Sequence, residues 1–180
     1  MAEKSEDKAL RVTPLIKPEE DSTRGTSGVI AEKYLIFAIK GERYTLPSGI
    51  IGEVAVLEKV FPMPLVPDYV RGLINRFSIP YVLIDISMFL NKDASDAQKI
   101  IVLKNDVEKI AFLIDDVIDI VEIPPSKLVK IEKEAEHPAK YGFNPSINAC
   151  FESEGKSVLC LDTEELISGI KKGFEREVRK

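Results

Sequence analysis

The sequence predicts a mostly β protein, built as two similar small lobes and closed by a C-terminal helix. Short apolar runs rich in valine and isoleucine recur at regular spacing between turn signals, which is the pattern of small β-lobes. The segments "VLIDISMFL" (82–90) and "VLCLDTEELI" (158–167) each run from an apolar strand into an aspartate that can cap a helix. A true duplication and two independent helix caps explain this echo equally well. The length of 180 residues suits one domain or two small lobes that share a core.

The two ends of the chain differ in character. Residues 1–30 are polar, mixed in charge and short of aromatic side chains, so they cannot bury enough apolar surface to offset the entropy of ordering them. A disordered arm is therefore expected there. The folded domain is expected over residues 31–168, and residues 169–180 form the end of the last helix.

The first half of the folded domain is expected to hold five strands. "KYLIFAIK" and "RYTL" form a hairpin around a Gly41-Glu42 turn. "IIGEVAVLEKV" (50–60) is a third strand, bent at Gly52. Three prolines make "FPMPLVPD" an irregular connector, and "YVRGLIN" and "IPYVLIDI" complete the set.

The strand pattern restarts after the polar break "NKDASDAQ" (91–98). "KIIVLK" and "KIAFLID" flank a turn at "NDVE", and "VIDIVEI" does not sort into one wet and one dry face, so a bend between the lobes is expected. After a loop, "INACFE" and "SVLCL" form a hairpin around "SEGK". The last helix has an apolar stripe at four-residue spacing, and the two glycines inside it should make its final turns fray. The stripe is Leu166, Ile170, Phe174 and Val178, and the glycines are Gly169 and Gly173.

Composition excludes several function classes. The net charge of −5 argues against a general nucleic-acid binder, because no lysine-arginine face can neutralise phosphates. No signal peptide opens the chain and no apolar run approaches 18 residues, so a cytoplasmic protein without direct membrane insertion is expected. Cys150 and Cys160 are interpreted as two buried free thiols of a reducing cytosol, with a disulfide between them as the alternative.

The residues that could carry chemistry do not form a catalytic set. His137 stands alone in a charged loop, and "GERYTLPSG" lacks the spacing of a phosphate-binding loop. Asp115 and Asp116 follow one another on a strand and so point to opposite faces, which makes one a turn or cap residue and leaves the other solvated. We therefore predict no enzyme, cofactor or metal; an enzyme that uses the aspartates or the cysteines is the remaining alternative.

A resemblance to a known family comes from "VPDYVRGLIN", the stretch around Arg71 and Gly72. It resembles the central motif of the CheW-like adaptor family of bacterial chemotaxis without a gap, with Glu53 in the place of an upstream family glutamate. Two further segments, "FLIDDVIDIVEI" and "VLCLDTEELI", are similar to the family's later motifs, and the similarity covers about residues 33–168.

The resemblance implies a fold and a function. The lobes would be SH3-like five-stranded β-barrels. The protein would be a non-catalytic scaffold that couples a CheA-type histidine kinase to chemoreceptors in membrane-associated arrays. One lobe would bind the regulatory domain of the kinase, and a groove between the lobes would bind the chemoreceptor cytoplasmic tip; other CheW-like proteins are further candidate partners. The alternative is a divergent interaction module that serves a specialised or non-chemotaxis kinase pathway.

The resemblance also selects candidate partner-binding residues, which are Ile51, Glu53, Arg71, Gly72, Asn75, Phe77 and Pro80. At Phe77 the family usually has an arginine, at Ser78 it has a glycine, and Pro80 lies two residues before the usual proline. Simpler roles stand beside these: close packing for Gly72, core for Ile51, a turn contact for Asn75, and solubility for Glu53 and Arg71. Phe77 is expected either tucked against its own lobe or exposed to a partner.

Overall fold

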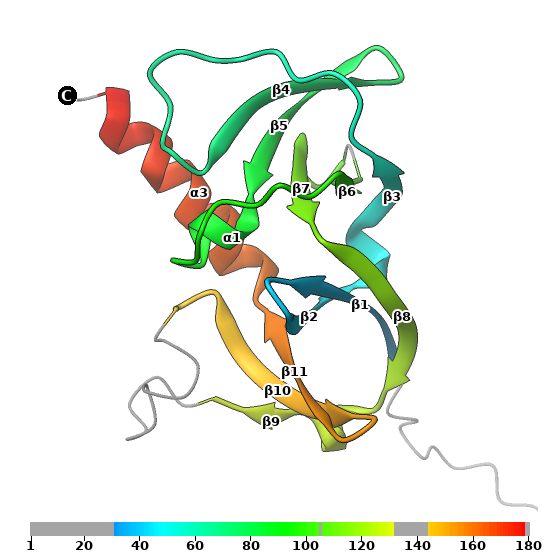
Figure 1. The fold of residues 1–180 in the computed structure, drawn as a ribbon. Coiled ribbons are helices and arrows are strands. Elements are labelled where there is room, and N and C mark those ends of the chain that lie inside the picture. The colour runs from blue at the N-terminus through cyan, green and yellow to red at the C-terminus, as the bar shows by residue number, and fades with distance from the viewer. Residues whose placement is uncertain (1–30, 105, 132–143, 179–180) are drawn as a thin grey trace, which may run out of the picture.

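The computed structural model describes residues 31–104, 106–131 and 144–178, and it forms two sheets with a helix beside them (Figure 1). The predicted mostly β fold with a long C-terminal helix is confirmed. The predicted disordered arm and the loop that holds His137 lie outside the described residues. No helix within the described ranges is long and apolar enough to cross a membrane, and no cluster of metal-ligating side chains occurs in them.

The terminal lobe is the sheet made by both ends of the folded chain. Its strand order is β8-β1-β2-β11-β10-β9. The bounds are β1 Glu32–Ile39, β2 Glu42–Pro47, β8 Asp116–Ile123, β9 Val129–Lys130, β10 Ile147–Ser153 and β11 Lys156–Leu161. Both hairpins predicted from the sequence, β1–β2 and β10–β11, are present. The sheet has a sixth strand because the short β9, which the sequence did not indicate, pairs with β10.

The central lobe is the five-stranded sheet made by the middle of the chain, in the order β3-β6-β7-β5-β4. The bounds are β3 Ile51–Val56, β4 Val70–Arg76, β5 Ile79–Asp85, β6 Lys99–Leu103 and β7 Ile110–Ile114. β3 ends at Val56 rather than at residue 60, so the predicted third strand was too long. Its predicted bend is confirmed, because the register with β6 shifts between Ile51 and Glu53, at Gly52.

The chain returns from the central to the terminal lobe at Asp115 and Asp116. Asp115 accepts hydrogen bonds from the backbone N–H of Lys40 at 2.5 Å and from the Ser95 hydroxyl at 3.2 Å, so it ties both lobes to the crossing point. Asp116 is exposed and pairs with Lys99, and this contact lowers the pKa of the Asp116 carboxyl. The predicted division of this pair into a structural and a surface aspartate is confirmed.

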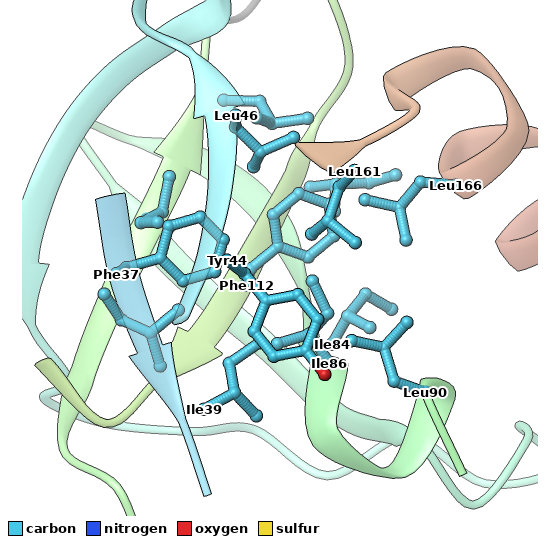
Figure 2. Packing of buried hydrophobic residues seen from close by; sticks show 14 of the residues in the cluster. Phe37, Ile39, Tyr44, Leu46, Ile84, Ile86, Leu90, Phe112, Leu161 and Leu166 are labelled. Atoms are coloured by element: carbon cyan, nitrogen blue, oxygen red, sulfur yellow. The ribbon is translucent and has the colours of Figure 1, made fainter. Parts of the chain in front are cut away.

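The two lobes share one hydrophobic core. Its side chains come from β1 and β2 of the terminal lobe, from β5 and β7 of the central lobe, and from the last helix (Figure 2). Fully buried members are Phe37, Tyr44, Leu46, Ile84, Phe112 and Leu166. Each sheet also buries its other face in a cluster of its own. Burial on both faces explains why the strands are continuous apolar runs rather than alternating ones.

Two short sequence signals place the helices. Asp85 accepts from the N–H groups of Ser87 and Met88 at the start of α1 (Ile86–Phe89), and Asp162 accepts from Glu164 and Glu165 at the start of α3 (Thr163–Val178). Both predicted aspartate caps are confirmed.

The glycines of α3 have a packing role that the sequence did not reveal. A Cβ at Gly169 would lie 2.9 Å from Phe89 Cζ, and a Cβ at Gly173 would lie 1.7 Å from Tyr69 Oη. Tyr69 donates to the Ile170 carbonyl at 3.2 Å and meets Phe89 edge-on. The glycines therefore let two aromatic rings seat against the helix, which continues to Val178.

The cysteines lie on opposite faces of the β10–β11 hairpin. Cys150 pairs with Leu159 and packs on the shared core, whereas Cys160 pairs with Ala149 in the terminal lobe's own cluster. Neighbouring strands that point two thiols to opposite faces cannot join them, so both are free. Cys160 is buried as predicted, but Cys150 is only half-buried.

Candidate interaction surface on the central lobe

Glu53 and Arg76 join the two edge strands of the central lobe. Arg76 Nε donates to Glu53 Oε2 at 3.2 Å, and Arg76 Nη2 contacts Glu53 Oε1. The side chains are only 17% and 28% exposed, so the ion pair is partly shielded from water. The hydrogen bond to Glu53 raises the pKa of Arg76. Such a two-point pair fixes the orientation of both groups and links β3 to β4 where no backbone ladder does so.

Arg76 belongs to this surface but was not among the partner-binding residues predicted from the sequence. The resemblance places the family arginine at Phe77 and does not select Arg76. Arg76 lies one residue earlier, on the same side of β4 as the buried Ile74, and this side faces Glu53. Period-two alternation counted from Ile74 would have identified it.

Phe77 and Ser78 form the two-residue turn between β4 and β5. Both have positive φ, 51° and 65°, which is the pattern of a type I′ hairpin turn. Asparagine and glycine favour these positions, whereas a phenylalanine with positive φ is strained. Phe77 is 83% exposed, so of its two predicted positions the exposed one is correct. The Arg76 guanidinium lies 5.6 Å from the Phe77 ring centroid.

A hollow of about 190 Å³ lies beside this turn. It opens onto Ile74 and Ile100, which belong to the central lobe's own cluster. Val56 and Phe61 also line the hollow, and their apolar side chains are 63% and 45% exposed. Its remaining lining residues are Leu57, Glu58, Lys59, Asn75 and Arg76. The hollow is thus apolar at its base and carries both signs of charge in its wall.

Arg71 is exposed on β4, with 38% of its side chain accessible, and its guanidinium also makes contacts within the chain. Its Nη2 donates to the Ser95 carbonyl at 3.1 Å, and its Nε lies 3.9 Å from the carboxylate of the fully buried Asp85. The Ser95 N–H donates to the same Asp85 carboxylate at 2.9 Å. Arg71 therefore balances a buried charge and holds the loop after α1, which gives it a structural reason beyond solubility.

Gly72 is required by a close backbone approach. Its φ is +136°, and a Cβ there would lie 2.3 Å from the carbonyl oxygen of Phe61. Phe61 and Leu73 exchange two backbone hydrogen bonds of 2.8 and 2.7 Å at this point. The packing role expected for Gly72 is confirmed: it lets the proline-rich connector lie on β4 and brings Phe61 to the hollow.

The remaining candidate residues divide between core and surface. Ile51 is half-buried and packs on the shared core, as its simpler interpretation expected. Asn75 and Pro80 are cross-strand partners on β4 and β5, and both are exposed. The surface that the structure brings together thus contains Glu53, Asn75, Phe77 and Pro80 of the predicted set, with Arg76 added.

Two sheets on a shared core form a β-rich domain, and an exposed apolar turn beside a hollow on one lobe is a feature typical of protein-interaction surfaces. The model of the CheW-like domain matches residues 33–171, which is most of the chain. The protein belongs to the CheW-like domain family, and the family expected from the motif around Gly72 is confirmed. No curated protein matches the chain.

A solved structure gives the same fold. The scaffolding protein TtCheW from Thermoanaerobacter tengcongensis has 16% sequence identity and a TM-score of 0.63. The match covers 73% of this chain and 89% of that protein. At this identity the likeness concerns the fold, and the side chains that distinguish this protein must be considered on their own.

Proposed function

We propose that the protein is a non-catalytic scaffold that couples a CheA-type histidine kinase to chemoreceptors. Membership of the CheW-like family supports this function, and the family is one of adaptors rather than enzymes. The protein would act in the cytoplasm, next to the membrane arrays of its receptors.

The central lobe is proposed to bind the regulatory domain of the kinase. The observation that carries this assignment is the exposed surface of Phe77, Val56 and Phe61 beside the half-buried Glu53–Arg76 pair. Exposed aromatic side chains next to a fixed charge pair resemble the centre of a binding site, where aromatic and arginine residues dominate the energy. The chemoreceptor tip is proposed to bind between the lobes, as the resemblance implies.

Phe77 favours a variant of this function with a specialised partner. A phenylalanine offers apolar area where an arginine would offer a forked donor for carboxylates. The partner is therefore proposed to present an apolar pocket, and a partner that presents an acidic group there would leave that group unpaired. This supports a divergent module that serves its own kinase or receptor.

Titration of the regulatory domain of a CheA-type kinase from the same cell tests the proposal. Phe77→Arg is expected to weaken binding by about 1–3 kcal/mol, the range for a central aromatic contact. Its melting temperature should stay near that of the wild type, because the side chain is 83% exposed. Ile120→Arg on β8 is the matched control, since Ile120 is 59% exposed on the other lobe. Unchanged binding by Phe77→Arg, or equal loss by the control, would refute the assigned surface.

A further inference from the structure

Phe77 carries two unfavourable features in the isolated chain. Its backbone is held at φ 51°, a region that bulky side chains avoid because it is strained for them. Its ring is also 83% exposed, so the chain gains little hydrophobic stabilisation from it. The contact of its ring with the Arg76 guanidinium at 5.6 Å is a weak one at so exposed a site, so the strained backbone points to a role outside the single chain.

The hollow beside Phe77 has the size of one aromatic ring. Its volume is about 190 Å³, and an apolar cavity of about 150 Å³ binds a benzene molecule. Ile74 and Ile100 supply its apolar base, and Phe61 stands at its edge. A phenyl ring inserted there would gain apolar contacts from several sides.

The Phe77 ring of the same chain does not fill this hollow, because it is 83% exposed and is not among the lining residues. The wall of the hollow carries Glu58, Lys59 and Arg76, so both signs of charge border it. Glu58 lies 3.6 Å from Arg76, and Lys59 lies over the Phe61 ring at 4.8 Å. A wall that carries both positive and negative side chains can pack against a second copy across a two-fold axis, because each positive group can then lie opposite a negative group of the other copy.

We propose that two copies of this chain associate through the central lobe, with Phe77 of each copy inserted in the hollow of the other. Phe77 and the hollow lie side by side on one surface. Arg76 connects them, because it contacts the Phe77 ring and also lines the hollow. A two-fold contact of this kind is closed, since each surface meets its own copy and no further chain can add.

The inference does not rest on the proposed function, because it concerns the isolated chain. If both hold, the dimer and the kinase would compete for one surface. Self-association would then keep the apolar turn covered until a kinase is present.

Sedimentation velocity on the full chain, from about 1 µM to about 1 mM, tests the dimer. The wild type is expected to show a concentration-dependent rise from monomer to dimer that does not proceed to larger species. Phe77→Ser removes the ring that is inserted, and Val56→Glu places a charged side chain at the edge of the hollow. Each change occurs twice in a two-fold contact, so each should raise the dimer Kd at least about tenfold. Ile120→Glu, at an apolar position of the terminal lobe that is 59% exposed against 63% for Val56, is the matched control and should not change the dimer Kd.

Several results would overturn the proposal. One is a wild type that stays monomeric over the whole range of concentration. Another is a dimer that survives Phe77→Ser or Val56→Glu with the wild-type Kd. A third is equal loss in Ile120→Glu. Far-ultraviolet circular dichroism and melting temperatures must show that the variants fold. If kinase binding fails while the dimer forms, only the proposed function is refuted.

Discussion

At the scale of single residues, the motif around Gly72 serves the fold before it serves a partner. Gly72 admits the connector, and Arg71 neutralises the buried Asp85. Asn75, Phe77 and Pro80 are exposed at and beside the β4–β5 turn, and Arg71 stays partly exposed while it pairs with Asp85. We therefore propose that contact with a partner is concentrated at the turn after the motif rather than in the motif itself.

Gly72→Ala is expected to destabilise the protein by about 2–3 kcal/mol. The new Cβ would combine a strained φ of +136° with a 2.3 Å approach to the Phe61 carbonyl oxygen. Urea unfolding measures the loss. Gly49→Ala is the control, because a Cβ at Gly49 meets nothing within 4 Å, and it should change stability by less than about 0.5 kcal/mol. Equal effects of the two substitutions would contradict the role given to Gly72.

The two cysteines are expected to differ in reactivity. Burial raises the pKa of the Cys160 thiol to about 12, so it stays protonated at pH 8, and reagents cannot reach it. Cys150 is half-buried and should be alkylated first in the native protein. Mass spectrometry of peptides after brief treatment with iodoacetamide measures the order, and denatured protein is the control. Faster labelling of Cys160 than of Cys150 in the native state would contradict the burial of Cys160 on β11.

At the scale of elements, α3 is fixed to the central lobe by its glycines rather than by its apolar stripe alone. Leu166 and Ile170 bury in the shared core, while Gly169 and Gly173 receive Phe89 and Tyr69. The helix follows β11 of the terminal lobe, so this contact ties the chain's end to the other lobe.

Gly173→Ala is expected to lower stability by about 1–2 kcal/mol, although alanine favours helices by about 1 kcal/mol over glycine. The Cβ would lie 1.7 Å from Tyr69 Oη, so the ring or the helix must move. Thermal unfolding measures the change. In a Tyr69→Phe background the closest atom is absent, and the cost should fall. Lys172→Ala, at an exposed position, is the control. A stabilising Gly173→Ala would mean that the glycine serves only to weaken the helix.

Strands and caps could be predicted from the sequence because local signals specify them. Apolar runs marked the strands, and an aspartate at the end of each of two strands marked the helix starts. β9 could not be predicted, since two exposed residues pair only because β10 lies beside them. The Glu53–Arg76 pair, the hollow and the packing of Gly173 join residues that are distant along the chain, and periodicity carries no information on such contacts.

At the scale of the whole molecule, the lobes are expected to unfold together. The shared core takes Phe37 and Tyr44 from the terminal lobe and Ile84 and Phe112 from the central lobe, so neither lobe keeps its core without the other. Far-ultraviolet circular dichroism and tyrosine fluorescence should give one coincident urea transition. Two separate transitions would show that each lobe is stable on its own cluster.

We propose that the surface around Glu53 and Arg76 recognises the kinase regulatory domain. Glu53→Arg or Arg76→Glu alone breaks a partly shielded pair, so loss of binding could follow from loss of stability. The double variant Glu53→Arg with Arg76→Glu restores the pair with its charges reversed, and its melting temperature should approach that of the wild type.

Isothermal titration of the regulatory domain with this double variant is the most direct test. We expect the double variant to be folded and to bind at least about tenfold more weakly, with a larger loss at low salt, because charges are screened beyond about 10 Å at 0.1 M. Wild-type affinity in the double variant would contradict the claim, since the pair would then serve the fold alone.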